Sequence, residues 1–335
     1  SIRAIQERQT DLYKQIALAV VWMVLFHILF GIFVYRLIFL RVEKLRTASD
    51  LMAEGNLKAR ADWKMQRSDE LDDLGEAFNS MAGKIEETIE TITRLNTEIQ
   101  QELEIGKEVQ ELFLPEKQPF KENLAMFFRP LREVSGDVYH FYQFGPRYRA
   151  LFFADASGHG VSAALITTIT VMSLHDAVAR SIKPWAILTD LNNRIMERLQ
   201  ANFFATAVFF ILDDKTRTLY YSNAGHNAPL YIRPASGEIL ELEKCGPPLG
   251  MMDEVEYPGK GIKTRPGDRL LVYSDGLVET RNGQGEDFGL DRVKEILRSE
   301  ISHPPQEQLQ ILSSTFVSYV TEYKDDVSIM LLEIP

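Results

Sequence analysis

The chain has 335 residues, enough for two or three domains, and its 45% hydrophobic and 25% charged residues argue against a disordered protein. A formal net charge of −11 argues against a nucleic-acid partner, because phosphates require basic patches. The single cysteine, Cys245, excludes an internal disulfide bond and a cysteine-rich metal site. Since the first residue is Ser1 and not Met, we expect residues 1–15 to be the end of an upstream sensor region.

An apolar run from Ile16 to Tyr35 continues as LIFL after Arg36. At about 1.5 Å per residue it is long enough to cross a hydrocarbon core of about 30 Å. It is too long for a signal peptide and has no small-residue cleavage site. A buried helix of a soluble protein is the alternative, but such helices seldom stay apolar on all sides for this length. We therefore predict one transmembrane helix over residues 16–40.

The basic residues that flank this run favour a cytoplasmic position for everything after it. They are Arg3, Arg8 and Lys14 before the run, and Arg36, Arg41, Lys44 and Arg46 after it. The chain is therefore expected in the plasma membrane, which is the inner membrane where a cell has two.

Two helical patterns around a polar break follow the apolar run. The first ends at Gly55, and the second begins near Asp69 and carries a heptad-like apolar seam. The seam residues are Leu71, Leu74, Phe78, Met81 and Ile85. The sequence SDELDDLGEAFNSM resembles the second helix of HAMP domains. That resemblance implies a HAMP domain over residues 41–94, a dimeric helical bundle that carries signals from membrane to output domain; a passive coiled-coil spacer is the alternative.

The same seam continues through Ile92, Leu95, Ile99 and Leu103 toward Pro115, whose ring ends the helix. Residues 95–117 are therefore predicted to form a helical, coiled-coil linker. A lone helix would expose this stripe, so pairing with a second chain as a homodimer is expected.

From Phe120 onward the sequence changes to short apolar runs rich in β-forming residues, which predict strands. The runs are LAMFFRP, VYHFYQF, YRALFFAD, FFATAVFFILD, TLYYSNAG, DRLLVYSDG and DVSIMLLEI. Helices are predicted for about Val161 to Arg180, Trp185 to Leu199, Leu290 to Glu300 and Pro305 to Tyr323. Because most strands follow one another directly, residues 118–335 are predicted to be α+β, with antiparallel sheets covered by helices.

Acidic residues recur at the ends of these strands, beside glycine or in pairs. They are Asp137 after Gly136, Asp155 after the strand ALFFA, Asp275 after LLVY, and Asp325 with Asp326 before VSIMLLEI. Carboxylates brought together from several strand ends supply the hard oxygen ligands that divalent cations prefer. A single Asp-Gly pair is weak evidence, because it is also the commonest hairpin signal. The ordered series is more specific and predicts a metal site.

A series of blocks resembles, in order, the SpoIIE/RsbU-like phosphatases of the PPM (protein phosphatase 2C) superfamily. The blocks are GDVYHF, DASGHGVSAALI, FATAVFFILD, NAGHNAPLYI, PPLG, PGDRLLVYSDGLVETRN and DDVSIMLLE. The resemblance implies an αββα sandwich with two Mn²⁺ or Mg²⁺ ions at one end, which activate a water for direct attack on phosphorus.

The resemblance also assigns roles residue by residue. Asp155 matches the carboxylate that bridges both metals, and the backbone carbonyl of Ala156 matches a neighbouring ligand. Asp275 and Asp325 match further metal ligands, and Asp137 matches an acidic position that holds metal directly or through water. Asp326 falls where relatives vary and is kept as a secondary acidic candidate.

Two histidines and two arginines are further candidates for the site. His159 does not have the spacing of the general acid in eukaryotic relatives, so a proton-donor role and a turn-stabilising role both stay open. His226, in NAGHNAP, is expected to be structural. Arg129 and Arg132 are the candidates to replace the eukaryotic phosphate-binding arginine, but neither lies in a matching motif.

These expectations together describe a membrane-anchored, signal-regulated, metal-dependent protein serine/threonine phosphatase. In the family, the usual substrate is a phosphorylated STAS-domain anti-sigma-factor antagonist. The alternative is a catalytically silent signalling scaffold, which would be free to lose Asp155 or Asp275. A membrane-linked nucleotide cyclase has no matching motif in this sequence.

Overall fold

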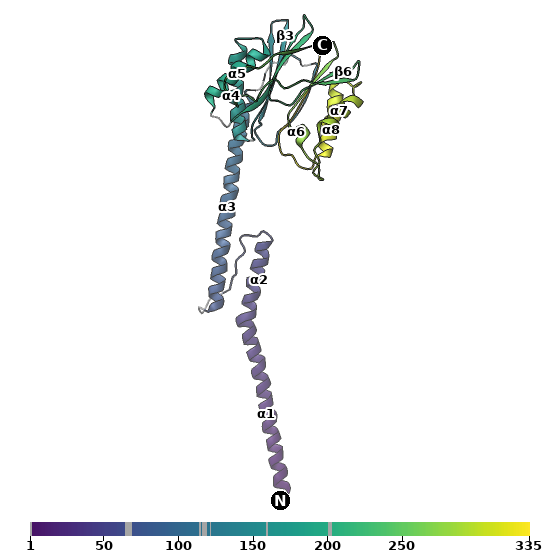
Figure 1. Ribbon diagram of the computed structural model, residues 1–335. Coiled ribbons are helices and arrows are strands. Elements are labelled where there is room, and N and C mark those ends of the chain that lie inside the picture. Colours follow the sequence, from purple (N-terminus) through teal and green to yellow (C-terminus); the bar gives the residue numbers. More distant parts are fainter. Residues whose placement is uncertain are drawn as a thin grey trace. The chain divides into compact units, whose positions relative to one another are not determined.

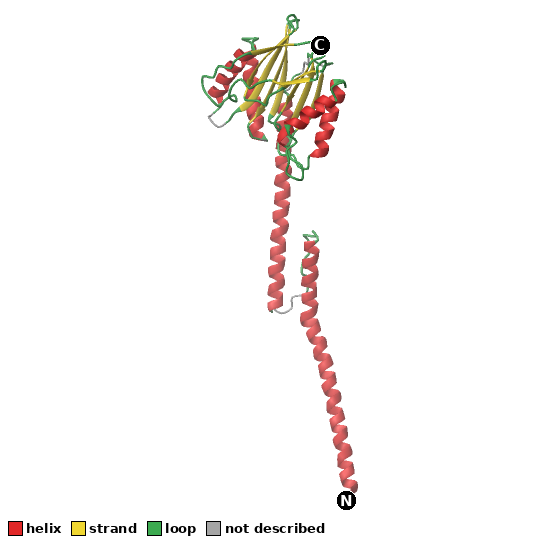
Figure 2. Ribbon diagram, turned by 45° about the vertical axis from the view of Figure 1, so that its right-hand side comes forward, coloured by secondary structure: helices red, strands yellow, loops and turns green. Residues whose placement is uncertain are grey.

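The computed structural model describes residues 2–63, 69–113, 115, 119–120, 122–158, 160–199 and 203–335; of residues 2–10, it describes the side chain of Arg8 alone. The chain forms two compact units, Ser1–Ile99 and Gln100–Pro335. Figures 1 and 2 show the helical character of the first unit and the layered sheets of the second.

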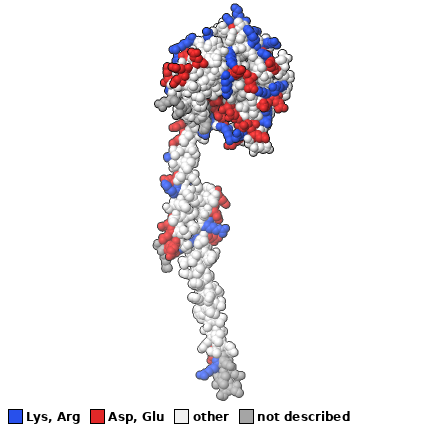
Figure 3. Space-filling model, in the orientation of Figure 1, with Lys and Arg blue, Asp and Glu red and all other residues white. Residues whose placement is uncertain are grey.

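The first unit begins with a helix that runs without interruption through the predicted membrane span. Helix α1 (Ile2–Val34) passes through a π-helical turn, η1 (Tyr35–Phe39), into α2 (Leu40–Ala53). The stretch from Asp11 to Ala53 is long and apolar enough to cross a membrane by length and composition. Its central part is free of Lys, Arg, Asp and Glu and is white in Figure 3.

The end of α2 and the start of the next helix follow the sequence signals. Gly55, with φ +100°, lies just after α2 in the left-handed conformation that glycine adopts readily. Helix α3 (Glu70–Glu111) begins after Asp69, whose carboxylate accepts a hydrogen bond from the backbone N–H of Asp72 at 3.0 Å. The connector between the helices is held by Asn79, whose amide bonds the N–H and the carbonyl of Ala61 at 2.8 and 3.0 Å.

The second unit contains two antiparallel five-stranded sheets. The first has the order β1-β10-β9-β6-β7, from β1 (Leu124–Arg129), β10 (Val327–Glu333), β9 (Arg269–Tyr273), β6 (Leu230–Arg233) and β7 (Glu238–Glu241). The second has the order β2-β3-β4-β5-β8, from β2 (Asp137–Phe144), β3 (Tyr148–Ala156), β4 (Ala205–Asp213), β5 (Thr218–Ala224) and β8 (Lys260–Lys263). The predicted α+β class with antiparallel sheets is confirmed.

Helices cover the outer face of each sheet (Figures 1 and 2). Helices α4 (Val161–Val178) and α5 (Pro184–Arg198) pack on the β2–β8 sheet, where Leu174 and Leu188 meet Phe152 and Phe209. Helices α7 (Leu290–Ser299) and α8 (Pro305–Tyr319) pack on the other sheet. A short helix, α6 (Gly276–Glu279), follows β9. The layers are therefore helix, sheet, sheet and helix, as the sequence predicted.

The inner faces of the two sheets share one apolar core. Phe153 and Phe210 of one sheet pack in the same cluster as Tyr231, Val272 and Met330 of the other. The segment TLYYSNAGHNAPLYI crosses between the sheets, because β5 and β6 belong to different sheets. It is one of the connections by which the chain passes from one sheet to the other.

We predict that Phe153→Ala lowers the free energy of unfolding of this unit by about 3–5 kcal/mol, because the ring is fully buried between the sheets. Phe203→Ala is the matched control, since that ring is 43% exposed and its loss should cost far less. Denaturant unfolding followed by near-ultraviolet circular dichroism measures both. Equal losses in the two variants would contradict this account of the core.

Candidate metal centre

Asp137 and Asp155 lie opposite each other at one end of the β2–β8 sheet. Asp137 is the first residue of β2, Asp155 is the last but one of β3, and the two are register partners. Directly opposed residues of antiparallel strands point to the same face of the sheet. Thr206 of β4 is the next partner in the same row, on the other side of Asp155.

The other acidic residues come from the adjacent ends of β9 and β10. Asp275 is the N-cap residue of α6, and Asp325 and Asp326 directly precede β10. The two strand ends are joined by the Ser274 N–H, which bonds the Ser328 carbonyl at 3.0 Å. Gly276 is required here, because an added Cβ would lie 2.1 Å from the Asp326 carbonyl oxygen.

Hydrogen bonds join the two groups across the sandwich. The hydroxyl of Ser328, on β10, donates to Asp137 Oδ2 at 2.5 Å. The β2–β3 end of one sheet and the β9–β10 end of the other therefore meet at one place. All five acidic residues named from the sequence lie at this end of the sandwich.

The carboxylates raise one another's pKa values. Burial, followed by the charge of Asp155, raises the pKa of Asp137 well above its ordinary value. Burial and the charges of Asp275, Asp325 and Asp326 raise the pKa of Asp155 to about 8. Burial and the charge of Asp325 raise the pKa of Asp275 to about 6. Such a cluster of desolvated, repelling carboxylates is stabilised by bound cations.

The donor set fits a hard divalent cation. Asp137 Oδ1 is buried and has no hydrogen-bond partner among the described residues, so one lone-pair-bearing oxygen is left for a ligand. The carbonyl of Ala156 lies close by, 3.2 Å from the position a Cβ on Gly136 would take. Across the described residues, however, no three Asp, Glu, His or Cys side chains already converge tightly enough to hold an ion.

Unlike Asp137, Asp326 has hydrogen-bond partners on both of its carboxylate oxygens. Its Oδ1 accepts the Leu131 N–H at 2.6 Å, and its Oδ2 accepts both the Ser135 hydroxyl at 2.7 Å and the Gly136 N–H at 2.6 Å. The Asp326 N–H in turn donates to Asp325 Oδ1 at 2.8 Å. Of the two adjacent aspartates, Asp326 thus anchors the 131–136 loop to the start of β10.

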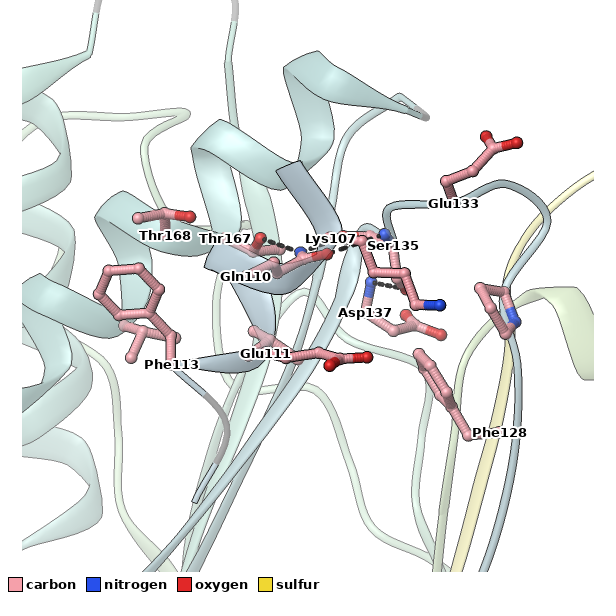
Figure 4. A pocket seen from close by; sticks show the side chains of 13 residues that line it. Lys107, Gln110, Glu111, Phe113, Phe128, Glu133, Ser135, Asp137, Thr167 and Thr168 are labelled. Carbon is pink, nitrogen blue, oxygen red and sulfur yellow. Dashed lines mark hydrogen bonds between the residues drawn. The ribbon is translucent and has the colours of Figure 1, made fainter. Parts of the chain in front are cut away.

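The sequence did not single out the polar residues around these carboxylates. Ser135, Ser274 and Ser328 stand beside predicted ligands, but serine is too common at turns for its position to be informative. Gln110, at the end of α3, bonds the Ser135 carbonyl at 2.7 Å and the Thr167 hydroxyl at 3.0 Å (Figure 4). Only the fold shows that this linker residue reaches the loop before Asp137.

The structure places the candidate histidine His226 and the candidate arginines in different surroundings. His226 is 1% exposed, its Nδ1 lies 2.8 Å from the Thr206 hydroxyl, and its backbone N–H bonds the Asn223 side chain at 2.8 Å. It lies inside the crossover between the sheets, which fits the predicted structural role. Arg129 stacks over the Tyr323 ring at 4.0 Å, and Arg132 is exposed. His159 lies outside the described residues.

Comparison with known proteins agrees with this geometry. Residues 145–335 match the family described as Stage II sporulation protein E (SpoIIE), and residues 33–87 match the HAMP domain. Protein IcfG of Synechocystis sp. is 28% identical over 82% of this chain and 48% of its own length. The phosphoserine phosphatase RsbP of Bacillus subtilis is 30% identical over 56% of this chain and 47% of its own length. The chain thus spans about half the length of these relatives.

Solved structures show the same fold. The SiaA-PP2C domain of Pseudomonas aeruginosa superposes with a TM-score of 0.66 at 24% identity, covering 72% of this chain and 99% of that domain. The SpoIIE phosphatase domain of Bacillus subtilis, with a regulatory fragment, superposes with a TM-score of 0.56 at 19% identity, covering 63% of each chain. Because the SpoIIE family model matches more than half of it, the chain belongs to the SpoIIE family; its second unit has the fold of these PP2C domains, and the residues that match the HAMP domain precede that fold in the sequence.

Proposed function

We propose that this chain is a metal-dependent protein serine/threonine phosphatase. The observation that carries the proposal is that Asp137 and Asp155 of one sheet lie at the same end of the sandwich as Asp275 and Asp325 of the other. Burial and mutual repulsion raise the pKa values of Asp137, Asp155 and Asp275. These residues, with the Ala156 carbonyl, would hold two Mn²⁺ or Mg²⁺ ions. Bound cations of this kind activate a water and stabilise charge on the phosphoryl oxygens.

The protein's own contribution is to place the ligands. The register of β2 and β3 sets Asp137 against Asp155, so both carboxylates would be available to hold the ions. The Ser328 hydroxyl fixes one oxygen of Asp137 and leaves the other for a ligand. No serine or cysteine nucleophile would be needed, because bound cations would supply an activated water.

The substrate we propose is a phosphorylated protein, specifically a STAS-domain anti-sigma-factor antagonist. Support comes from relatives named phosphoserine phosphatases, RsbP and RsbU of Bacillus subtilis. A catalytically silent scaffold remains the rival from another class. Hydrolysis of p-nitrophenyl phosphate with and without Mn²⁺ separates them, because a scaffold hydrolyses nothing in either condition.

The N-terminal third of the chain is proposed to anchor and regulate the enzyme as a membrane-spanning homodimer. We divide the chain into an N-terminal flank (1–15), a transmembrane helix (16–40), a HAMP domain (41–94), a linker (95–117) and a phosphatase domain (118–335), with the last in the cytoplasm. In the single chain, seam residues Leu74, Met81, Ile92 and Ile99 are 49%, 53%, 52% and 53% exposed. An apolar stripe left this open on a long helix is what a partner helix covers.

We expect Asp155→Asn to abolish phosphatase activity, because the amide removes the charge that holds two cations together. Asp214→Asn is the matched control, since Asp214 pairs with Arg149 at 2.6 Å, away from the carboxylate cluster. Release of phosphate from a phosphoserine peptide, with Mn²⁺ and with excess EDTA, measures the effect. Undiminished turnover in EDTA would contradict the proposed mechanism.

Removing metal should make stability depend on pH. A carboxyl group whose pKa is raised in the folded state contributes stability below its unfolded pKa and loses that contribution as pH rises through the folded value. With the pKa of Asp155 at about 8, the melting temperature in EDTA should fall by at least about 5 °C between pH 5 and pH 8.5. Mn²⁺ should abolish most of that fall, and an identical fall with and without Mn²⁺ would show that the carboxylates bind no cation.

Phase along α3 should matter for signalling, because α3 is one continuous helix from Glu70 to Glu111. One residue inserted after Gln100 rotates everything downstream by about 100°, whereas seven residues nearly restore the phase. Basal activity in membranes should therefore change with the single insertion and largely return with the heptad. Crosslinking should show dimers in both variants, and activity indifferent to both insertions would make the helix a simple tether.

A further inference from the structure

Ser135 makes hydrogen bonds with both its backbone and its side chain, although it is only 5% exposed. Its hydroxyl donates to Asp326 Oδ2 at 2.7 Å and accepts the Asp137 N–H at 3.0 Å. Its own N–H donates to Gln110 Oε1 at 3.1 Å, and its carbonyl accepts from Gln110 Nε2 at 2.7 Å (Figure 4). A single small side chain therefore connects Asp326 to the backbone of Asp137.

Asp326 holds the same loop from the other side. Its Oδ2 accepts two hydrogen bonds and its Oδ1 a third, all from residues 131–136. A carboxylate oxygen that already accepts two donors has little lone-pair capacity left for a metal. The charge of Asp326 thus strengthens its hold on the loop, because hydrogen bonds to an ionised acceptor are short and strong.

These contacts, together with one from Ser328, restrict the position of Asp137. Its backbone N–H is held by Ser135, and its Oδ2 is held by the Ser328 hydroxyl at 2.5 Å. While the backbone N–H and Oδ2 of Asp137 are held in this way, its second carboxylate oxygen, Oδ1, stays buried without a hydrogen-bond partner among the described residues. A carboxylate fixed in this way has lost its rotational freedom before any ligand arrives, which favours binding.

We propose that Ser135 and Asp326 are positioning residues that fix Asp137 for cation binding, and that neither is itself a ligand. This inference rests on the proposed function, since it assumes that Asp137 takes part in holding a divalent ion. Groups that orient metal ligands typically change metal affinity by about 10- to 100-fold when they are removed. A purely structural loop anchor would instead change stability and leave affinity alone.

The test of the inference is a measurement of Mn²⁺ binding by isothermal titration calorimetry. It uses the full chain in detergent, without substrate. Ser135→Ala removes only the bridging hydroxyl and should weaken Mn²⁺ binding at one of two sites by about 10-fold or more. Asp326→Asn keeps the shape but puts an amide group where Ser135 and Gly136 need an acceptor, so it should weaken the same site. Phosphatase activity in both variants should need more Mn²⁺ and recover toward the wild-type kcat when Mn²⁺ is saturating.

Ser222→Ala is the matched control. Ser222 is fully buried on β5 and its hydroxyl donates to the Pro258 carbonyl at 2.9 Å, so its loss removes a similar hydrogen bond away from the carboxylates. The melting temperature of Ser222→Ala should fall, with unchanged Mn²⁺ affinity. If Ser135→Ala or a folded Asp326→Asn binds Mn²⁺ within about twofold of wild type, the inference is wrong while the proposed function stands. A wild-type chain that binds no Mn²⁺ overturns both.

Discussion

Repulsion among buried carboxylates at one end of the sandwich is the constraint on which the account depends. Asp137, Asp155 and Asp275 each have raised pKa values because burial removes water and the neighbouring carboxylates add like charge. A fold that assembles such a cluster sacrifices stability there unless cations neutralise it. Three features of the surrounding structure keep the cluster in place. The strand register sets Asp137 against Asp155, and Gly276, which has no room for a Cβ, lets the turn at Asp275 approach β10. The Ser328 hydroxyl of one sheet donates a hydrogen bond to Asp137 of the other.

The sequence predicted the architecture well because the strands of the sandwich are long apolar runs. The runs that contain Phe152, Phe209 and Leu271 are buried on both faces, and their strands were all expected. Strands β7 and β8 were not predicted, because EILE and KGIK are short edge segments with exposed polar residues. Helix α6 is a four-residue turn after Asp275, too short for any periodicity to show. The domain boundaries stay predictions.

The acidic residues of the site could be found in the sequence because they lie at strand ends, near glycine or in pairs. The polar residues that hold these carboxylates could not be found in the sequence. Ser135, Ser328 and Gln110 contribute to the site only through contacts with residues far away along the chain. The Ser328 hydroxyl reaches Asp137 across 191 positions, and Asp326 reaches the loop at Ser135 across the same separation. The roles of Asp326 and of its neighbour Asp325 also differ in a way that two adjacent identical letters cannot reveal.

The central claim is that these carboxylates hold two divalent cations. The most direct measurement is anomalous X-ray diffraction from crystals of the protein grown with Mn²⁺, using data collected at the manganese edge. The account predicts two anomalous peaks about 4 Å apart, with Asp155 between them. It further predicts that Asp137, Asp275 and Asp325 supply the other carboxylate ligands, and that Asp326 stays on its loop. An absence of anomalous density beside Asp155 in such crystals would contradict the claim.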